Sequence, residues 1–253
     1  GQFNLPTHPQ PSDHGFQHWF STQNNALPTH HNPQNFVRNG HPVGPQRGYS
    51  AGLVADEAIR WLRGHDPSSP FFLYVCFHEP HEPINSAPRY KSLYKAPADS
   101  TLPNHHGNVT QMDAALGRLL STLDRMKLRD NTLLIFTSDN GPAITRRHPH
   151  GSAGPLRDKK GFVSEGGIRV PGIIHWPGHT RPGDVCDEPV CGIDLLPTLC
   201  AVAGAEVPAD RTIDGSSFLP IFTGQKIQRQ TPLYWQFNYA QGPAKVAMRH
   251  GDW

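Results

Sequence analysis

Hydrophobic and polar positions along the middle of the chain follow two periods, one helical and one strand-like. Apolar residues at helical spacing predict a helix over 51–62, with Ser50 as its N-cap, and a second helix over 106–126. Continuous apolar runs over 71–77 and 131–137 predict strands that are buried on both faces. A helix followed by an apolar strand, twice in succession, predicts an α/β fold with a mostly parallel sheet flanked by helices.

Shorter elements follow the second strand. We expect a helix over 194–203, capped by Asp194 and ended by Gly204. We also expect four short strands, over 168–170, 173–176, 234–237 and 246–248. The last two strands begin a smaller sheet. The sequence therefore predicts a main domain over 1–222 and the beginning of a C-terminal subdomain over 223–253. Because the chain opens at Gly1 without a methionine, we expect it to be a piece of a longer protein.

The composition of the chain argues against several classes of protein. The formal net charge of +2 is too small for an electrostatic nucleic-acid binder. No run of about 20 apolar residues exists, so we expect no membrane-spanning segment. The 24 glycines and 26 prolines indicate long irregular loops around a compact framework. The four cysteines lack C-x-x-C spacing and suggest no zinc knuckle, and Cys76, in its apolar run, is expected to be a core thiol.

Polar residues follow both apolar strands, where the ligand sites of α/β sheets gather. Asp139 and Asn140 are adjacent hard oxygen donors that suit Ca²⁺ or Mg²⁺, although Asp-Asn-Gly is also good turn chemistry. His78 and His81 lie in a proline-stiffened loop. They can supply a general acid or a metal ligand, and ordinary surface histidines are the alternative.

A third polar cluster is the glycine-framed loop that holds Lys159 and Lys160. A lysine presents its ammonium to an anionic group as a compact point charge with three donors. Gly161 allows a ligand to approach the backbone beside Lys160 closely. A solvated charge pair is the alternative, and it is the favoured interpretation for Lys159.

The three clusters occur in the order and setting of the type I sulfatases, members of the alkaline-phosphatase-like superfamily. The segment 137–142 (TSDNGP) resembles that family's calcium segment, and 156–172 (LRDKKGFVSEGGIRVPG) resembles its lysine loop. Further similarities cover 71–83, 194–199 and 214–220. The resemblance implies an alkaline-phosphatase-like fold and an enzyme that hydrolyses sulfate esters and releases inorganic sulfate.

The resemblance also implies roles for individual residues. Asp139 and Asn140 would bind calcium, with magnesium as a possible substitute. Lys160 would hold a sulfate oxygen and the bridging ester oxygen, and His81 would assist the leaving group. A divalent cation and an ammonium stabilise the charge that develops on the departing alkoxide. These four side chains are therefore expected to converge around one anion pocket.

Four more residues are candidates for substrate contacts: His78, Arg146, His148 and His150. The last three lie in a loop between the metal and lysine segments. A solvated basic loop is an equally good interpretation of these residues.

The sequence departs from the family pattern in its first part. The family's nucleophile is a formylglycine made from Cys or Ser in a C/S-x-P/A-x-R motif, and none of the four cysteines has that context. We expect this motif and the family's Asp-Asp calcium pair upstream of Gly1, and the 253-residue piece alone to be inactive. The opening GQFNL can be a degenerate form of the family's G-K-W-H-L segment, in which Gln2 and Asn4 replace a catalytic Lys and His. Alternatively, the G-K-W-H-L segment precedes residue 1, and we prefer this second interpretation.

Other function classes stay open. The nearest is a phosphodiesterase or phosphonate hydrolase of the same superfamily, and a noncatalytic His-rich metal- or glycan-binding module is the other. The histidine-rich entry region and the aromatics Phe16, Trp19 and Phe20 suit a sulfated carbohydrate as substrate, although apolar packing explains the aromatics equally well. Substrate identity and oligomeric state are not readable from the sequence. Asn108 begins an Asn-Val-Thr glycosylation sequon, relevant only in a eukaryotic secretory context. A periplasmic or secreted location follows from the family resemblance alone.

Overall fold

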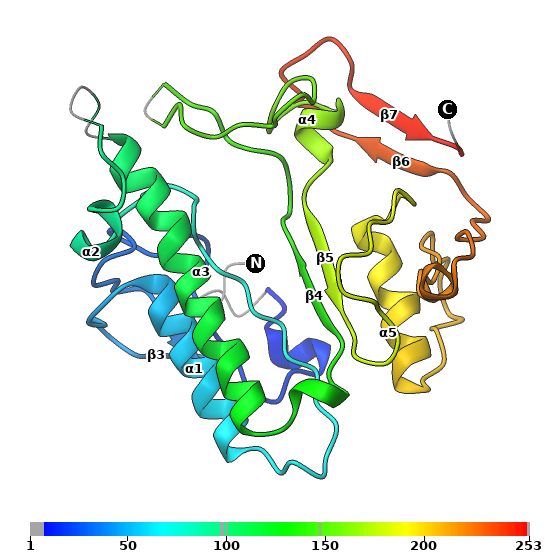
Figure 1. The fold of residues 1–253 in the computed structure, drawn as a ribbon, viewed down its shortest axis with the longest axis horizontal. Coiled ribbons are helices and arrows are strands. Elements are labelled where there is room, and N and C mark those ends of the chain that lie inside the picture. Colours follow the sequence, from blue (N-terminus) through cyan, green and yellow to red (C-terminus); the bar gives the residue numbers. More distant parts are fainter. Residues whose placement is uncertain (1–7, 97–98, 100, 147, 252–253) are drawn as a thin grey trace. The chain divides into compact units, whose positions relative to one another are not determined.

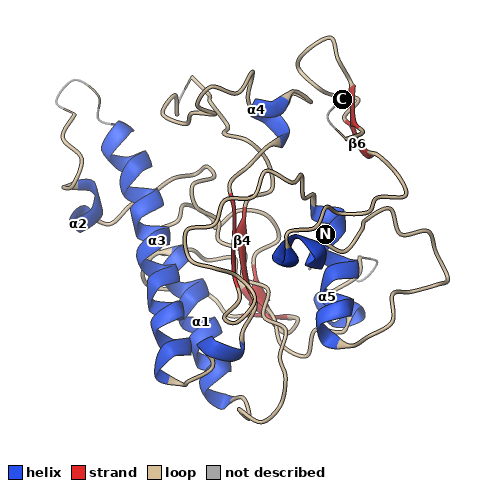
Figure 2. Cartoon of the chain, turned by 45° about the vertical axis from the view of Figure 1, so that its right-hand side comes forward, coloured by secondary structure: helices blue, strands red, loops and turns tan. Residues whose placement is uncertain are grey.

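The computed structural model describes residues 8–96, 99, 101–146 and 148–251. They belong to two compact units. The first comprises Gly1–Arg129 with Ile144–Gly151, and the second comprises Asp130–Ala143 with Ser152–Trp253. Long loops connect the helices and strands (Figure 2), as the glycine and proline content predicts.

Two long helices build the first unit. α1 (Ser50–Gly64) and α3 (Thr101–Arg125) lie side by side in Figures 1 and 2. Their shared face buries Ala58, Ile59, Leu62, Leu119 and Leu123. Both predicted helices are confirmed, because apolar residues three or four apart form one stripe on each helix and the two stripes pack together.

The remaining elements of this unit are short. They are η1 (Pro11–His14), the antiparallel sheet of β1 (Phe20–Ser21), β2 (Val37–Arg38) and β3 (His41–Pro42), and the helix α2 (Pro88–Lys91). The 3-10 turn η2 (Arg129–Asn131) falls where the first unit gives way to the second along the chain. None of the helices in the described ranges is long and apolar enough to cross a membrane.

The N-terminus of α1 differs from the prediction. Tyr49 is the N-cap residue and Ser50 is the first helical residue, so the expected cap by Ser50 is wrong. A carboxylate from outside the helix takes the capping role. Glu79 Oε1 accepts the Ser50 hydroxyl at 2.6 Å and the Ala51 N–H at 2.8 Å.

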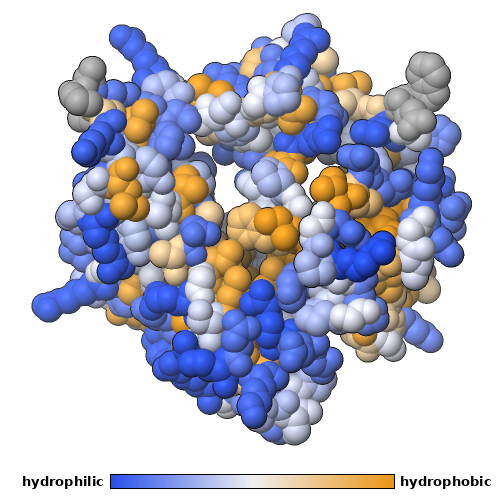
Figure 3. Space-filling view, viewed as in Figure 1, coloured by the Kyte–Doolittle hydropathy of each residue, from blue (hydrophilic) through white to orange (hydrophobic). Residues whose placement is uncertain are grey.

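The segment 71–77 is not assigned as a strand, and the expected burial of both faces is wrong. One set of alternate side chains packs against the α1–α3 core: Phe71, Leu73 and Val75. The side chains between them are exposed, Phe72 by 60% and Tyr74 by 70%. Cys76 is exposed as well, so it is not a core thiol. Apolar side chains reach the surface at many points of the face in Figure 3. An apolar run thus reports an extended segment, but not what covers its second face.

The second unit is built on β4 (Leu134–Thr137) and β5 (Gly172–His175), which pair antiparallel with Thr137 opposite Gly172. Its other elements are α4 (Glu165–Ile168), η3 (Gly192–Asp194), α5 (Leu195–Ala203), η4 (Leu219–Thr223), and the antiparallel pair β6 (Leu233–Gln236) and β7 (Val246–Arg249). The predicted end of α5 is confirmed, because Gly204 adopts the left-handed φ of 65°.

The strands that pair within the described residues run antiparallel. One local prediction fails in this unit. The strand expected over 168–170 is not assigned: Ile168 is the last residue of α4, where the N–H groups of Gly167 and Ile168 both donate to the Ser164 carbonyl, and 169–170 belong to neither a helix nor a strand. The domain boundary between residues 222 and 223 stays a prediction.

A buried carboxylate ties the loops around α5 together. Asp194 is fully buried and accepts the N–H groups of Cys191, at 2.7 Å, and Ser216, at 2.9 Å. Arg229 also donates to both of its oxygens, at 2.7 and 2.8 Å. Neighbouring Asp194 raises the pKa of Arg229 above its usual value through these hydrogen bonds. One side chain therefore fixes three separate segments.

Removing that carboxylate tests its role. We expect Asp194→Ala to lower the free energy of unfolding by about 3–5 kcal/mol, because the largely buried Arg229 is left without its counter-charge. Urea unfolding of the whole protein measures the change. The matched control is Asp210→Ala, which removes the exposed ion pair with Arg211 and should leave the midpoint unchanged. Equal midpoint shifts in the two variants would contradict the assignment.

Candidate functional site

The predicted metal ligands follow directly after β4 in the second unit. Asp139 is exposed, so its carboxylate oxygens face solvent. Asn140 donates from Nδ2 to the Gly141 carbonyl at 3.0 Å, which leaves its Oδ1 oxygen as an acceptor. Two hard oxygen donors in adjacent positions fit Ca²⁺ or Mg²⁺ chemically. Within the described part of the chain, no group of three or more His, Cys, Asp or Glu side chains is arranged to hold a metal.

The lysine loop is joined to this segment through the backbone. Gly141 N–H donates to the Gly167 carbonyl at 2.9 Å, and Lys160 N–H donates to the Pro142 carbonyl at 3.1 Å. The approach is so close that a Cβ atom on Gly141 would lie 1.9 Å from the Gly166 carbonyl oxygen. The sequence-predicted residues Asp139, Asn140 and Lys160 therefore belong to two segments that are held against each other.

The lysine loop is also compact within itself. The N–H of Gly166 donates to the Arg157 carbonyl at 2.7 Å, and the Ser164 hydroxyl donates to Asp158 Oδ2 at 2.5 Å. A Cβ atom on Gly166 would meet the Asp158 carbonyl oxygen at 2.2 Å. Lys160 lies half-buried in this loop. The glycine pair at 166 and 167 is thus required by close backbone packing around the lysine.

The histidine loop belongs to the first unit, and His81 is exposed in it. His81 Nδ1 lies 2.7 Å from the Glu82 carbonyl oxygen. A carbonyl only accepts hydrogen bonds, so Nδ1 carries a proton and the ring is held by it. Nε2 is then the ring nitrogen that this contact does not engage. This is the arrangement that a general acid requires.

His78 has a different environment from His81. Its Nε2 lies 2.7 Å from Thr22 Oγ1, and its ring packs edge-on against Phe36 at 5.6 Å between centroids. Burial is the main reason that the pKa of His78 is lowered from 6.5 to about 4, and the neighbouring His30 and His81 act in the same direction. The side chain is therefore neutral and packed at pH 7. Its predicted role in substrate contact stays a prediction.

The predicted substrate loop also lies in the first unit. Glu82 accepts the Thr145 hydroxyl at 3.1 Å, and His148 Nε2 lies 3.7 Å from the same carboxylate. Arg146 is exposed. The structure therefore brings the loop that carries Arg146 and His148 against the loop that carries His81.

His150 belongs to a histidine cluster that the sequence analysis missed. Its Nε2 lies 2.7 Å from Thr101 Oγ1 and 3.3 Å from Asp99 Oδ2. The rings of His105 and His106 lie 5.7 and 6.0 Å from the His150 ring. Burial, followed by the neighbouring histidines, lowers the pKa of His105 to about 4. The adjacent His-His pair is visible in the sequence, but its partner lies more than 40 positions further along the chain.

The predicted site residues thus fall into two groups. The second unit holds Asp139, Asn140 and Lys160, and the first unit holds His78, His81, Arg146, His148 and His150. The convergence of Asp139, Asn140, Lys160 and His81 on one anion pocket stays a prediction. Gln2 and Asn4, the candidate replacements for a catalytic Lys and His, lie outside the described residues.

Sequence reasoning also missed the buried polar network behind the histidine loop. Asn108 is fully buried in α3 and donates from Nδ2 to His30 Nδ1, at 3.3 Å, and to the Asn85 carbonyl, at 3.1 Å. Its amide is therefore not available in this fold as a glycosylation acceptor. Burial lowers the pKa of His30 to about 4. No periodic signal marks these residues, because each contact joins distant parts of the chain.

Comparisons with known proteins agree on one family. A family model described as Sulfatase matches residues 3–205. The steryl-sulfatase of Rattus norvegicus is 38% identical over 178 residues, 68% of this chain and 29% of that protein. The N-acetylgalactosamine-6-sulfatase of Mus musculus is 31% identical over 274 residues, 100% of this chain and 50% of that protein. The chain thus spans at most about half the length of these relatives.

A solved structure supports the same fold. The crystal structure of Ps i-CgsB in complex with k-i-k-neocarrahexaose superposes with a TM-score of 0.81 at 27% identity, covering 91% of this chain and 55% of that one. This match and the family model confirm the fold class that the motifs predicted.

Substituting Gly141 tests the contact between the metal and lysine segments. We expect Gly141→Ala to lower the free energy of unfolding by about 1–3 kcal/mol or more, because its Cβ would meet a backbone oxygen that cannot rotate away. Gly172→Ala is the matched control in the same unit, since a Cβ atom added there would meet nothing within 4 Å. Urea unfolding of both variants measures the difference. An unaffected Gly141→Ala protein would contradict the close packing.

The buried His30 predicts a pH dependence of stability. Its pKa is about 4 in the folded chain and 6.5 in an unfolded one, so between these values the unfolded state binds more protons. Stability should therefore fall as the pH drops from 6.5 to 4, by up to about 1.4 kcal/mol per pH unit for this group. His30→Asn should flatten the slope of unfolding free energy against pH, while the exposed His41→Asn should leave it unchanged. Parallel slopes in all three proteins would refute the prediction.

Proposed function

The chain belongs to the sulfatase family, and on this premise we propose that the whole protein hydrolyses sulfate esters and releases inorganic sulfate. The family model covers most of the chain, and the two relatives carry the names of sulfatases. The observation that carries the proposal is the backbone contact of the Asp139–Asn140 segment with the Lys160 loop. It holds two oxygen donors and an ammonium in neighbouring segments of one unit, as recognition of a sulfate group requires.

Each side chain has a distinct proposed task. Asp139 and Asn140 would hold calcium, which when bound would supply positive charge for the sulfate oxygens. Lys160 donates hydrogen bonds to a sulfate oxygen and to the bridging ester oxygen. Its charge stabilises the negative charge that gathers on the bridging oxygen as the S–O bond breaks.

His81 acts on the leaving group in this proposal. The protonated ring holds its Nδ1 proton on the Glu82 carbonyl and transfers the Nε2 proton to the departing alkoxide. A sugar alkoxide is a strongly basic leaving group, so protonation matters most for a carbohydrate ester. The loop of Arg146, His148 and His150, together with His78, is proposed to contribute to substrate binding.

The nucleophile is proposed to come from outside these 253 residues. No cysteine of the chain stands in a C/S-x-P/A-x-R motif. A formylglycine there would supply the nucleophile for the sulfur atom. The residues of this chain then bind the ester, stabilise its charge and protonate the alcohol that leaves.

We propose a sulfated carbohydrate as the substrate class and an exported enzyme, periplasmic or secreted. One relative is named for a sulfated amino sugar, N-acetylgalactosamine 6-sulfate, and the solved structure holds a neocarrahexaose. The location rests on family resemblance.

Activity of the whole protein tests the assignments. We expect Lys160→Ala to reduce kcat/KM for a sugar sulfate about 10²–10³-fold, because it removes a charge that acts in the transition state. His81→Ala should reduce it about 10²–10⁴-fold through lost proton transfer. Release of inorganic sulfate measures both. The exposed residues Lys226 and His41 provide matched controls, Lys226→Ala and His41→Ala, which should keep full activity.

Further outcomes separate the alternatives. Undiminished turnover in both Lys160→Ala and His81→Ala would overturn the assignments. Faster hydrolysis of phosphate diesters than of sulfate esters by the unaltered protein would favour the phosphodiesterase class. Calcium chelation should abolish activity and added Ca²⁺ should restore it; activity that persists in chelator would refute the metal role.

A further inference from the structure

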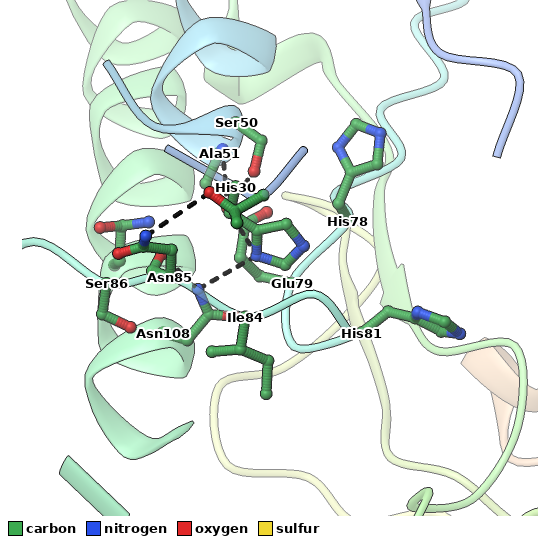
Figure 4. Close-up of polar contacts among 12 residues, drawn as sticks. His30, Ser50, Ala51, His78, Glu79, His81, Ile84, Asn85, Ser86 and Asn108 are labelled. Carbon is green, nitrogen blue, oxygen red and sulfur yellow. Dashed lines mark hydrogen bonds and ion pairs between the residues drawn. The ribbon is translucent and has the colours of Figure 1, made fainter. Parts of the chain in front are cut away.

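The loop that carries His81 is anchored by a side chain two residues earlier. Glu79 lies at the end of the extended segment 71–77, and its side chain is fully buried. Both of its hydrogen bonds go to the N-terminus of α1, from the Ser50 hydroxyl at 2.6 Å and the Ala51 N–H at 2.8 Å. Figure 4 shows Glu79 directed toward Ser50 and Ala51, whereas the His81 ring points away from this network.

A carboxylate suits this position. The first N–H groups of a helix have no partner within the helix and carry a partial positive charge, so they favour a buried anion. α1 has 15 residues and packs along α3, which makes its N-terminus a rigid base for the loop. The side chain of Tyr49, the N-cap residue of α1, makes no capping hydrogen bond, so it does not compete with Glu79.

The rest of the loop is held by backbone hydrogen bonds. His81 N–H donates to the His78 carbonyl at 2.8 Å and closes a turn around Glu79. The Pro83 carbonyl accepts the His30 N–H at 3.3 Å, and the His30 carbonyl accepts the Ser50 N–H at 2.8 Å. Glu79 is therefore the only side chain of 78–83 that bonds to α1 among the described contacts.

We propose that Glu79 is a positioning residue for His81: its bonds to Ser50 and Ala51 hold the loop so that His81 Nε2 meets the leaving-group oxygen. This inference rests on the role proposed for His81 above. Glu79 touches neither substrate nor reacting atoms. Its effect on the reaction passes through the orientation of one exposed imidazole, which is held in its loop by the Nδ1 contact to Glu82 and the turn to His78.

Leaving-group dependence gives the sharpest test. Proton transfer matters for a sugar sulfate, whose alkoxide is strongly basic, and little for 4-nitrophenyl sulfate, whose phenolate leaves without a proton. In the whole protein, Glu79→Ala should lower kcat for the sugar sulfate about 10-fold or more beyond its effect on kcat for 4-nitrophenyl sulfate, with KM little changed. Glu79→Gln keeps an oxygen that accepts from Ser50 and Ala51 and should recover most of the lost activity.

Destabilisation alone must be separated from positioning. Leu119→Ala removes a buried side chain between α1 and α3 without touching the loop, and it is assayed beside Glu79→Ala at a temperature where both remain folded. It should leave the ratio of the two kcat values unchanged. Equal losses on both substrates in Glu79→Ala, or failure of Glu79→Gln to recover activity, would overturn the positioning role.

His81→Ala distinguishes the two proposals. If it shows the leaving-group dependence and Glu79→Ala does not, the inference on Glu79 fails and the role of His81 stands. If His81→Ala lowers kcat equally for both substrates, the proposed proton transfer by His81 fails and the inference fails with it.

Discussion

The close approach of Gly141 to the glycine pair 166 and 167 is the constraint on which the second unit's site depends. At this contact, backbone meets backbone with no space for a methyl group. One strand end and one loop, well separated in the sequence, are thereby brought to hydrogen-bond distance. This packing sets the positions of the neighbouring polar residues. Asp139 and Lys160 need no direct contact with each other, because the backbone beneath them is already joined.

Buried carboxylates provide the second kind of fixation. Glu79 accepts two hydrogen bonds from the start of α1, and Asp194 organises three segments around α5. In a chain rich in loops, few regular hydrogen bonds hold the connections between elements. A single buried carboxylate replaces several of them, because one oxygen can accept more than one donor: Glu79 accepts two on Oε1, and Asp194 accepts two on each oxygen. The loops thus gain fixed geometry where the fold offers no sheet or helix to supply it.

The sequence predicts the parts of this structure that depend on local periodicity. The stripes of α1 and α3 are visible because their apolar residues repeat every turn, and Gly204 marks the end of α5 because few other residues adopt its backbone conformation. The prediction for 71–77 is wrong because an apolar run looks the same whether one face or both are covered. The prediction for 168–170 fails at its first residue, because the Ile168 N–H donates to the Ser164 carbonyl and Ile168 ends α4, a contact that no propensity reports.

The candidate site is predictable from motifs but not from isolated residue types, and His78 and His81 show why. They stand three residues apart in one loop and look alike in the sequence. Burial lowers the pKa of His78 and keeps it neutral against Phe36 and Thr22, whereas His81 is exposed and its Nδ1 contacts the Glu82 carbonyl. The difference arises at the turn that the His81 N–H closes on the His78 carbonyl, which leaves His78 packed against Phe36 and His81 on the surface. The environments of the two rings therefore differ because of the path of the backbone, and Glu79, between them, is bonded to the start of α1.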